Sequence, residues 1–424
     1  MRHERVEESS LNGSDIMRAG EYRILPAGES EARISRMQQV IQEEGLDGFL
    51  LTQNTDIYYL TGTMQTGYCF IPAVGEAVLY VRRSVARARE EAHIRTEELG
   101  AFREFGAKLA AGLAAAVPPG RKRLIGTPLD VLPAQTYLKL ADLLEPAGAA
   151  LTDASPLMRR QRMIKSPWEI ARIEQAAQAA AEALAEALNF LKEGVSELDW
   201  MARYEYEIRK RGHIGLMRMR AYNQEVITGM VGAGEAAAVP SYFDGPAGGR
   251  GLGASAPQSV SRRLFGRNEP ILLDVGCCID GYIIDQTRTA VIGELPEELL
   301  RAYGVTERIM RQSEKLLLPG IIAEKPYQEA LHMAEQEGLA DHFMGFGADR
   351  VRFLGHGIGL EVDEWPVLAK GFTMPLRAGM VIAVEPKFTF PGVGVVGIEN
   401  TYVIQEEGPP LALTRSPEQL IVLP

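Results

Sequence analysis

Five residues in the C-terminal half of the chain have the types and the flanking sequences of metal ligands. Asp274 ends the apolar run ILLD, Asp285 lies in GYIIDQTRT, His356 in LGHGIG, Glu385 closes VIAVE, and Glu399 lies in VGIENT. Four carboxylates and one imidazole suit a pair of divalent ions such as Mn, Co, Fe or Zn. Such a pair would polarise a water between its ions and give a nucleophile near neutral pH. The pattern therefore predicts an enzyme with a dinuclear centre.

Short strands must position these residues. The segment ILLDVGCCIDGYIIDQTRTAVIG predicts two strands joined by a tight turn at IDG, a hairpin that would bring Asp274 and Asp285 side by side. Glu385 and Glu399 end two apolar runs that are separated by a Pro/Gly-rich reversal, PGVG. His356 lies between glycines, which allow the backbone to approach closely and present the imidazole. Strand ends are therefore expected to form the site.

The N-terminal part of the chain alternates helical and strand patterns. An amphipathic helix is predicted from Glu29, followed by a turn at Gly45 and a buried strand GFLL. IYYLTG, EAVLYV and RLIGT are further predicted strands, and FREFGAKLAAGLAAA and AQTYLKLADLL are predicted helices. This alternation is typical of an α/β domain. We predict a loosely held tail over residues 1–25, an α/β domain over 26–157 and a second domain over 158–424, which opens with a basic connector and a long alanine-rich helix.

Composition narrows the class of protein. A chain of 424 residues can hold two domains, and its net charge of −11 and pI near 5.3 argue against nucleic-acid partners and anionic membranes. We find no apolar run long enough to span a membrane. Cys69, Cys277 and Cys278 provide no disulfide framework, so we expect a cytoplasmic protein. Adjacent Cys277 and Cys278 are expected as small buried side chains rather than metal ligands.

With these motifs in this order, the chain resembles the creatinase/prolidase/methionine aminopeptidase family, which has the pita-bread fold. SRMQQVIQEEGLDGFLLTQNTDIYYLTG is similar to the N-terminal domain of that family, and IKSPWEIARIEQAA to its linker helix. The resemblance implies an α/β creatinase-like N-terminal domain and an α+β pita-bread catalytic domain. A curved antiparallel sheet in the second domain would carry the metals on its concave face. The resemblance also implies a homodimer.

The same resemblance implies roles for the five ligands. Asp274 would chelate one ion, Asp285 and Glu399 would bridge both ions, and His356 and Glu385 would hold the other. Glu385 would also accept the proton of the bridging water. The implied reaction is cleavage of an amide or peptide bond in a small substrate by a metal-bridging hydroxide, as in Xaa-Pro dipeptidases and aminopeptidases. Two divalent ions are the expected cofactors, with Mn as the first choice and Co, Zn or Fe as alternatives.

Two positions depart from the proline-directed peptidases of the family, which hold the substrate with two additional histidines. The upstream histidine is replaced by Ser241 in one alignment and by Gln258 in another, and Asp363 replaces the downstream one. Ser or Gln can donate a hydrogen bond but cannot shuttle a proton near pH 7. An anionic Asp363 would favour a substrate with an amine or guanidinium. His213 is the best candidate for a replacement, although a structural role is favoured for it.

Other features also bear on the substrate. Arg218 and Arg220 in LMRMRAY would share one side of a predicted strand, where they could grip a carboxylate; the alternative is a solvated strand face. Lys387 shares the strand face of Glu385 and is expected near the metals, unless Pro386 ends the strand. The Gly-rich segment 241–253 is either a flap near the site or a plain surface connection.

Three functions are consistent with these features. The first is the dinuclear hydrolase described above. The second is a metal enzyme of the same fold with a non-peptide substrate, such as a hydrolase of an amino-acid derivative or a lyase. The third is a non-catalytic binding protein, against which the intact ligand set argues, because four clustered carboxylates repel one another without a metal.

Overall fold

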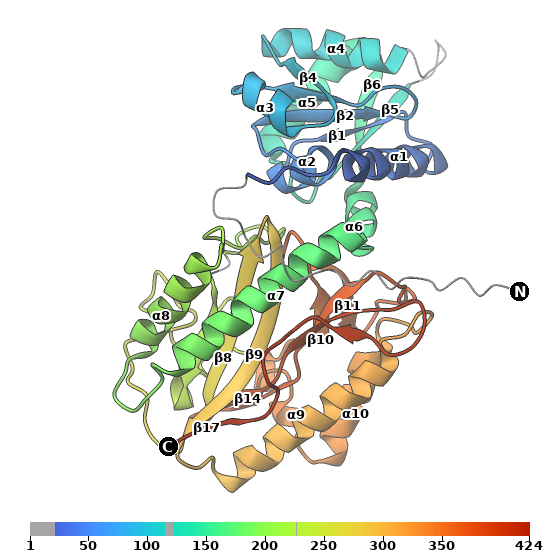
Figure 1. The fold of residues 1–424 in the computed structure, drawn as a ribbon. Helices are drawn as coiled ribbons and strands as arrows, with labels where there is room; N and C mark the ends of the chain where they lie inside the picture. Colours follow the sequence, from blue (N-terminus) through green and yellow to red (C-terminus); the bar gives the residue numbers. More distant parts are fainter. Residues whose placement is uncertain (1–21, 115–121, 226) are drawn as a thin grey trace, which may run out of the picture.

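The computed structural model describes residues 22–114, 122–225 and 227–424. Its N-terminal part is an α/β unit around a mixed sheet with the strand order β4-β3-β2-β1-β5-β6 (Figure 1). The elements are α1 (Ala27–Glu43), β1 (Gly48–Leu51), α2 (Asn54–Thr61), β2 (Gly67–Pro72), β3 (Val78–Val81), α3 (Val85–Glu91), β4 (Arg95–Glu98), α4 (Phe102–Ala114), β5 (Arg123–Thr127), α5 (Ala134–Leu144), β6 (Ala149–Asp153) and α6 (Ser155–Met163). The expected α/β character of this part is confirmed.

One predicted strand in this unit is wrong. IYYLTG belongs to helix α2 rather than to a strand. The side chain of Gln53 accepts a hydrogen bond from the backbone N–H of Asp56 and so caps the helix at its N-terminus. Gly62 ends the helix with a φ of 83°, a left-handed conformation that glycine adopts without strain. These local caps outweigh the strand preference of the aromatic and β-branched residues between them.

Helices α6 and α7 (Pro167–Leu188) lead from the first unit to the second, and α7 crosses the β8–β9 hairpin (Figure 1). The predicted boundary at residues 157 and 158 falls inside α6. Helix α7 starts with a capping box in which Ser166 accepts from the N–H of Glu169 and the Glu169 carboxylate accepts from the N–H of Ser166. The capping box therefore fixes the residue at which the alanine-rich helix begins.

The C-terminal part holds antiparallel sheets packed against helices, as expected for a pita-bread domain, with a parallel pairing of the last strand, β17, to β9. Two sheets have the strand orders β17-β9-β8-β7 and β11-β10-β12-β15-β16, and β13 pairs with β14. The remaining elements are α8 (Glu197–Lys210), β7 (Gly229–Ala233), β8 (Ile271–Ile279), β9 (Tyr282–Ile292), α9 (Glu297–Leu316), α10 (Lys325–Gln336), β10 (Phe353–Gly357), β11 (Glu364–Ala369), β12 (Val381–Val384), β13 (Lys387–Phe390), β14 (Gly394–Gly397), β15 (Asn400–Val403), β16 (Leu411–Ala412) and β17 (Ile421–Leu423).

One hydrophobic core is shared by both units, and further apolar clusters lie beside it. It includes Met37 of α1 and Ile57 of α2 in the first unit, and Val275 of β8 and Ile283 of β9 in the second. Small buried residues of α7, such as Ala180, belong to the same core and allow the hairpin to pack closely against the helix. The units are therefore joined by continuous apolar packing.

A buried network of charged residues also connects the two units. Arg162 of α6 forms ion pairs with Asp56 of α2 at 2.8 Å, with Glu361 at 2.8 Å and with Glu364 at 2.5 Å. Arg220 contributes a second guanidinium, 3.0 Å from Asp56. Burial raises the pKa of Glu364, but the nearby Arg162 and Lys165 lower it to about 2. The network holds the segment around Glu361 against the N-terminal unit.

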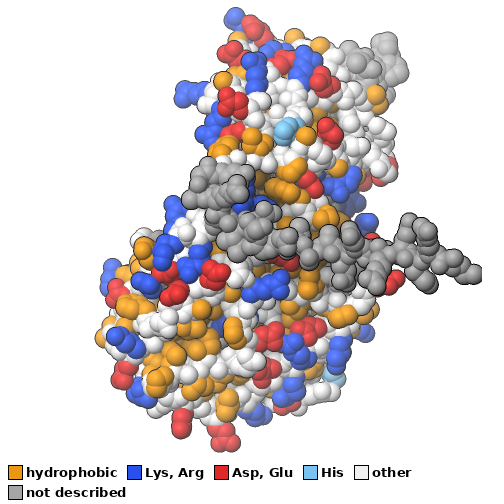
Figure 2. All heavy atoms as spheres, in the orientation of Figure 1, with side chains coloured by type: hydrophobic (Ala, Val, Ile, Leu, Met, Phe, Trp, Pro, Cys, Tyr) orange, Lys and Arg blue, Asp and Glu red, His pale blue; other side chains and the backbone are white. Residues whose placement is uncertain are grey.

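Residues 22–25 form the described part of the segment predicted as a loosely held tail; residues 1–21 lie outside the described residues. Arg23 donates to Asp280 at 2.9 Å, and the Leu25 side chain is buried. On the face shown in Figure 2, acidic and basic side chains are interspersed. None of the helices in the described part of the chain combines the length and the apolar character needed to cross a bilayer.

Candidate metal centre

The β8–β9 hairpin carries the two aspartates on one face. In the antiparallel register, Asp274 is opposite Thr287 and Gly276 is opposite Asp285. Because opposed residues and residues two positions apart share a face of a sheet, all four point to the same side. The predicted hairpin with adjacent aspartates is therefore confirmed.

The sheet β11-β10-β12-β15-β16 and its flanking residues supply the other three ligand candidates, His356, Glu385 and Glu399. His356 lies on β10 and pairs with Ala383 of β12, so that Glu385, just after β12, comes close to it. Glu399 lies between β14 and β15 and forms an isolated bridge with Thr287 of β9. That bridge joins the two sheets, with the backbone N–H of Glu399 donating to the Thr287 carbonyl at 3.0 Å.

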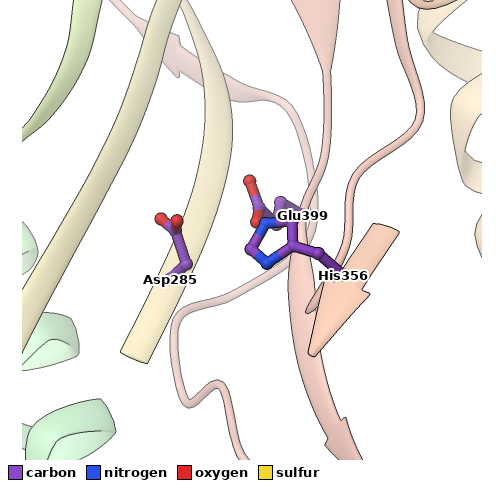
Figure 3. A group of neighbouring side chains, drawn as sticks. All are labelled: Asp285, His356 and Glu399. Carbon is purple, nitrogen blue, oxygen red and sulfur yellow. The ribbon is translucent and has the colours of Figure 1, made fainter. Parts of the chain in front are cut away.

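Asp285, His356 and Glu399 point into a common space (Figure 3). One ligand atom from each lies within 4.8 Å of the others. The Nδ1 of His356 lies 3.1 Å from the Gly357 carbonyl, an acceptor, so Nδ1 carries the hydrogen and Nε2 is left to bind an ion. Oε1 of Glu399 is buried and receives no hydrogen bond from the described residues. An orphaned carboxylate oxygen beside an imidazole nitrogen fits one divalent cation.

Lys387 lies beside the other acids, as its spacing from Glu385 predicts. Its Nζ is 2.6 Å from Oε2 of Glu385 and 3.1 Å from both Oδ2 of Asp274 and Oε2 of Glu399. Strand β12 ends at Val384, before Pro386, but β13 starts at Lys387 and brings this residue toward the cluster. Thr287 also donates to Oε2 of Glu399, at 2.8 Å.

Burial and mutual repulsion set the electrostatics of the cluster. Burial raises the pKa of Asp274 to about 6 and that of Glu385 to about 7, and Lys387 opposes both shifts. Burial, together with Glu399 and Asp274, raises the pKa of Asp285 well above its usual value. Burial alone would lower the pKa of Lys387, but the surrounding carboxylates raise it well above its usual value. The ammonium is therefore charged and is the cation that holds these acids together.

A cavity of about 230 Å³ opens onto the cluster. Its walls are largely apolar, with Met217, Met219, Phe243 and Val362 among them, and the metal-ligand candidates also line it. The volume is below the roughly 300–1,000 Å³ of drug-sized binding sites, so the cavity suits a small molecule. Part of the Gly-rich segment, residues 243–248, lines this cavity. Of the two interpretations of that segment, a flap near the site or a plain surface connection, this position favours the first.

The two alignment alternatives for the upstream histidine occupy different places. Gln258 lines the cavity, and its Nε2 donates to the Glu225 carbonyl and to the Tyr242 hydroxyl, both at 3.2 Å. Ser241 lines a neighbouring cavity and accepts from the N–H of Phe243 at 3.2 Å. Gln258 is therefore the one of the two that lies on the cavity with the metal-ligand candidates.

Asp363 also lines the cavity, but both of its oxygens already accept hydrogen bonds. Oδ1 accepts from the N–H of Arg220 at 2.8 Å, and Oδ2 from the N–H of Ala221 at 3.1 Å. The carboxylate thus fixes the backbone of the segment that runs along the cavity wall. Because Asp363 lines the cavity, its carboxylate can affect which charge a bound substrate carries most favourably.

The prediction for Arg218 and Arg220 is corrected by the structure. Residues 216–222 are irregular rather than a strand, because Asp363 takes the backbone N–H groups that a neighbouring strand would otherwise bind. The buried Arg220 guanidinium donates to Asp56 and to Asp130, at 2.8–3.1 Å. Arg218 donates to the Met64 sulfur at 3.4 Å and faces a different surface cleft. Arg220 therefore joins the two units and does not form a clamp with Arg218.

His213 lies outside the cavity. It is buried, its Nδ1 accepts from the N–H of Cys278 at 2.9 Å, and burial lowers its pKa to about 4, with Arg209 lowering it further. The histidine is thus a neutral structural acceptor. Cys277 and Cys278 are both buried and free, as expected of small apolar side chains.

Thr287 is a site residue that the prediction missed. It follows Asp285 by two positions on the same strand, so the alternation of strand side chains could have placed it on the ligand face. Its contact with Glu399 could not be foreseen, because that contact depends on the bridge between two sheets that are distant in sequence.

Comparison with known proteins gives matches along most of the chain. Residues 33–164 match the creatinase/prolidase N-terminal domain, and residues 171–406, more than half of the chain, match metallopeptidase family M24. The first match ends and the second begins close to α6 and α7.

Individual relatives cover nearly the whole chain at low identity. The chain is 26% identical to the Xaa-Pro dipeptidase of Pyrococcus horikoshii over 395 residues, which is 92% of this chain and 98% of that protein. It is 28% identical to the probable dipeptidase PepE of Mycobacterium tuberculosis over 406 residues, 92% of this chain and 96% of the relative.

Solved structures show the same arrangement. The crystal structure of the prolidase from Pyrococcus horikoshii superposes with a TM-score of 0.76 at 25% identity, covering 92% of this chain and all of that one. The dipeptidase PepE from Mycobacterium ulcerans superposes with a TM-score of 0.78 at 25% identity and covers 95% of this chain.

Proposed function

The chain belongs to metallopeptidase family M24, a family of peptidase-type hydrolases, and we propose that it cleaves an amide bond in a small substrate with the help of a divalent ion. Xaa-Pro peptides are the reference substrates, because curated relatives named Xaa-Pro dipeptidases match over nearly their full length. Mn is the first ion to test, followed by Co, Zn and Fe. The proposal needs only the ion position formed by Asp285, His356 and Glu399.

One observation carries this proposal. The orphaned Oε1 of Glu399 lies in a group with Asp285 and His356 at the end of a small, largely apolar cavity. A bound divalent ion would supply Lewis-acid polarisation of a carbonyl and activation of water. The apolar walls would keep bulk water away from the reacting bond and so strengthen electrostatic interactions within the cavity.

Side chains of the protein itself would handle the proton and the substrate. Glu385 is the candidate proton acceptor, since its Oε1 lies 3.6 Å from Nε2 of His356 and faces the same cavity. Gln258 would orient a carbonyl by exchanging one of its two N–H contacts, to the Glu225 carbonyl or to the Tyr242 hydroxyl, for the substrate, and it cannot transfer a proton near pH 7. Both roles can be tested by replacing the side chain.

The test is a hydrolysis assay on purified protein loaded separately with Mn, Co, Zn or Fe. We expect cleavage of at least one Xaa-Pro dipeptide or tripeptide, loss of activity after chelation, and recovery when metal is restored. Glu385→Gln should abolish turnover, while Glu335→Gln, an exposed glutamate on α10, should leave it unchanged. Absence of cleavage with every metal and every peptide would rule out the peptidase activity.

A second candidate is hydrolysis of an acylated amino acid or another non-peptide amide, or a lyase reaction. Asp363 and Gln258 favour it, because both line the cavity. The resemblance implies that Asp363, and Gln258 in one of the two alignments, stand where proline-directed peptidases of the family have histidines. Asp363 would attract a cationic substrate, and the Gln258 amide cannot transfer a proton near pH 7. Activity on acylated amino acids combined with none on peptides would select this alternative.

We also propose that the protein works in the cytoplasm as a homodimer. The free, buried cysteines in the described residues are compatible with a reducing compartment. Light scattering coupled to size-exclusion chromatography measures the mass of the particle, and a mass near 46.5 kDa, that of one chain, would contradict the dimer.

A further inference from the structure

Lys387 is fully buried and is bonded to three acids of the cluster. Its Nζ contacts Oε2 of Glu385, Oδ2 of Asp274 and Oε2 of Glu399 at distances of 2.6, 3.1 and 3.1 Å. An ammonium group has three N–H donors and no acceptor. Each donor therefore has one carboxylate, and the ammonium is satisfied by acids that were expected to bind metal.

The described residues keep a separate position for an ion. Asp285, His356 and Glu399 converge, whereas Asp274 is not part of that group. Glu399 belongs to both positions: its Oε2 accepts from Lys387, and its Oε1 receives no hydrogen bond from the described residues. One carboxylate therefore separates a position filled by an ammonium from a position that fits a metal.

The backbone is built to admit the lysine. Lys387 on β13 pairs with Gly397 on β14. A Cβ at position 397 would overlap Cγ of Lys387 and would lie 3.0 Å from its Cβ. The aliphatic stem of the lysine occupies the space that any other residue at position 397 would fill. The ammonium is thus held in place by the strand pair as well as by the acids.

Charge balance points the same way. Two divalent ions would neutralise the four negative charges of the carboxylates. The ammonium and one divalent ion together already neutralise three of these charges. A second ion next to the buried ammonium would be repelled, because screening inside a protein is weak. The lysine and a second ion therefore compete for the same acids.

We infer that the Lys387 ammonium takes the place of one ion of the expected pair, and that the centre binds a single divalent ion through Asp285, His356 and Glu399. This inference rests on the proposed function only in treating the cluster as a metal centre. Asp274 then acts as a partner of the lysine and not as a chelating ligand.

The experiment measures how many ions bind, without an activity assay. Protein freed of metal by chelation is titrated with Mn²⁺ in a calorimeter, and its metal content after dialysis is measured by mass spectrometry. We expect about one equivalent for the wild type and about two for Lys387→Gly, which removes both the ammonium and its stem. The electron paramagnetic resonance spectrum should show isolated Mn²⁺ in the wild type and coupled ions in the variant.

A matched control is Lys165→Met, which removes another buried ammonium, 2.9 Å from Glu364 and outside the cavity. It should still bind about one equivalent. Two equivalents or a coupled spectrum in the wild type would overturn the inference, as would one equivalent in folded Lys387→Gly. If that variant does not fold, the wild-type stoichiometry and spectrum decide. A wild type that binds one ion but cleaves no amide would refute the proposed function and leave the inference standing; a wild type that binds none would refute both.

Discussion

Lys387 and Gly397 face each other across the β13–β14 pair, and the lysine stem fills the space next to the glycine. Gly397→Ala should therefore displace the stem and lower the free energy of unfolding by about 1–3 kcal/mol, the usual cost of overpacking. Urea titration measures the change. In a Lys387→Gly background the cost should fall, since only the Pro386 carbonyl remains close, at 3.0 Å.

The matched control for this substitution is Gly304→Ala in α9, where an added Cβ meets only the tip of Arg308, at 3.8 Å. It should stabilise the protein by up to about 1 kcal/mol, since alanine favours a helix over glycine. An equal cost of Gly397→Ala in both backgrounds would mean that the backbone, and not the lysine, limits the space.

Thr287 orients Glu399, so Thr287→Val should weaken metal binding while leaving the candidate ligands in place. Loss of such a hydrogen bond to a ligand typically costs about 10–100-fold in metal affinity. Calorimetric titration with Mn²⁺ gives the dissociation constant. Thr306→Val, at a buried threonine that bonds only within α9, should leave that constant unchanged. An unaltered affinity in Thr287→Val would show that this contact does not orient the carboxylate.

Gln258 lies on the cavity and Ser241 does not, so the two positions should respond differently to histidine. Gln258→His adds a group that can transfer a proton near pH 7, and we expect kcat/KM for an Xaa-Pro dipeptide to rise about 10-fold or more. Ser241→His should have no effect on the same assay. A gain at position 241 instead of 258 would reverse this assignment.

Arg220 is buried against Asp56 and Asp130. Arg220→Met would leave these carboxylates without that partner and should lower the free energy of unfolding by about 3–5 kcal/mol, with little change in KM. Arg218→Met, at a partly exposed position, should change stability by less than about 1 kcal/mol. Urea unfolding and substrate titration measure the two quantities. A rise in KM for both variants with unchanged stability would support the original prediction that Arg218 and Arg220 grip a substrate carboxylate.

His213 should make stability fall as pH is lowered through the weakly acidic range. Its folded-state pKa is about 4, below the ordinary 6.5, so the unfolded chain binds the proton more readily between these values. The contribution of the neutral histidine is therefore present above pH 6.5 and is lost toward pH 4, by at most about 3 kcal/mol. His213→Asn keeps an acceptor for the N–H of Cys278 and should flatten this part of the curve of unfolding free energy against pH.

The sequence was sufficient to locate the helices and strands whose signals are local. The amphipathic pattern from Glu29 and the turn between β8 and β9 each depend on neighbouring residues, and both appear in the structure. IYYLTG failed because its composition favours a strand while its flanks, Gln53 and Gly62, cap a helix.

The contacts of the site were harder to predict than its elements. Arg218 and Arg220 alternate as in a strand, but the Asp363 carboxylate, more than a hundred residues away, holds this segment in an irregular conformation. Spacing placed Lys387 near Glu385. Its contacts with Asp274 and Glu399 depend on how two sheets meet, and no local pattern encodes that geometry.

The apolar core shared by α1, α2, α7 and the β8–β9 hairpin has a consequence for folding. Each unit also has further apolar clusters, but the shared core couples the two, so we expect one cooperative unfolding transition rather than unfolding unit by unit. A proteolytic cut in α7 would separate the two units and expose an apolar surface on each fragment. We expect such fragments to aggregate.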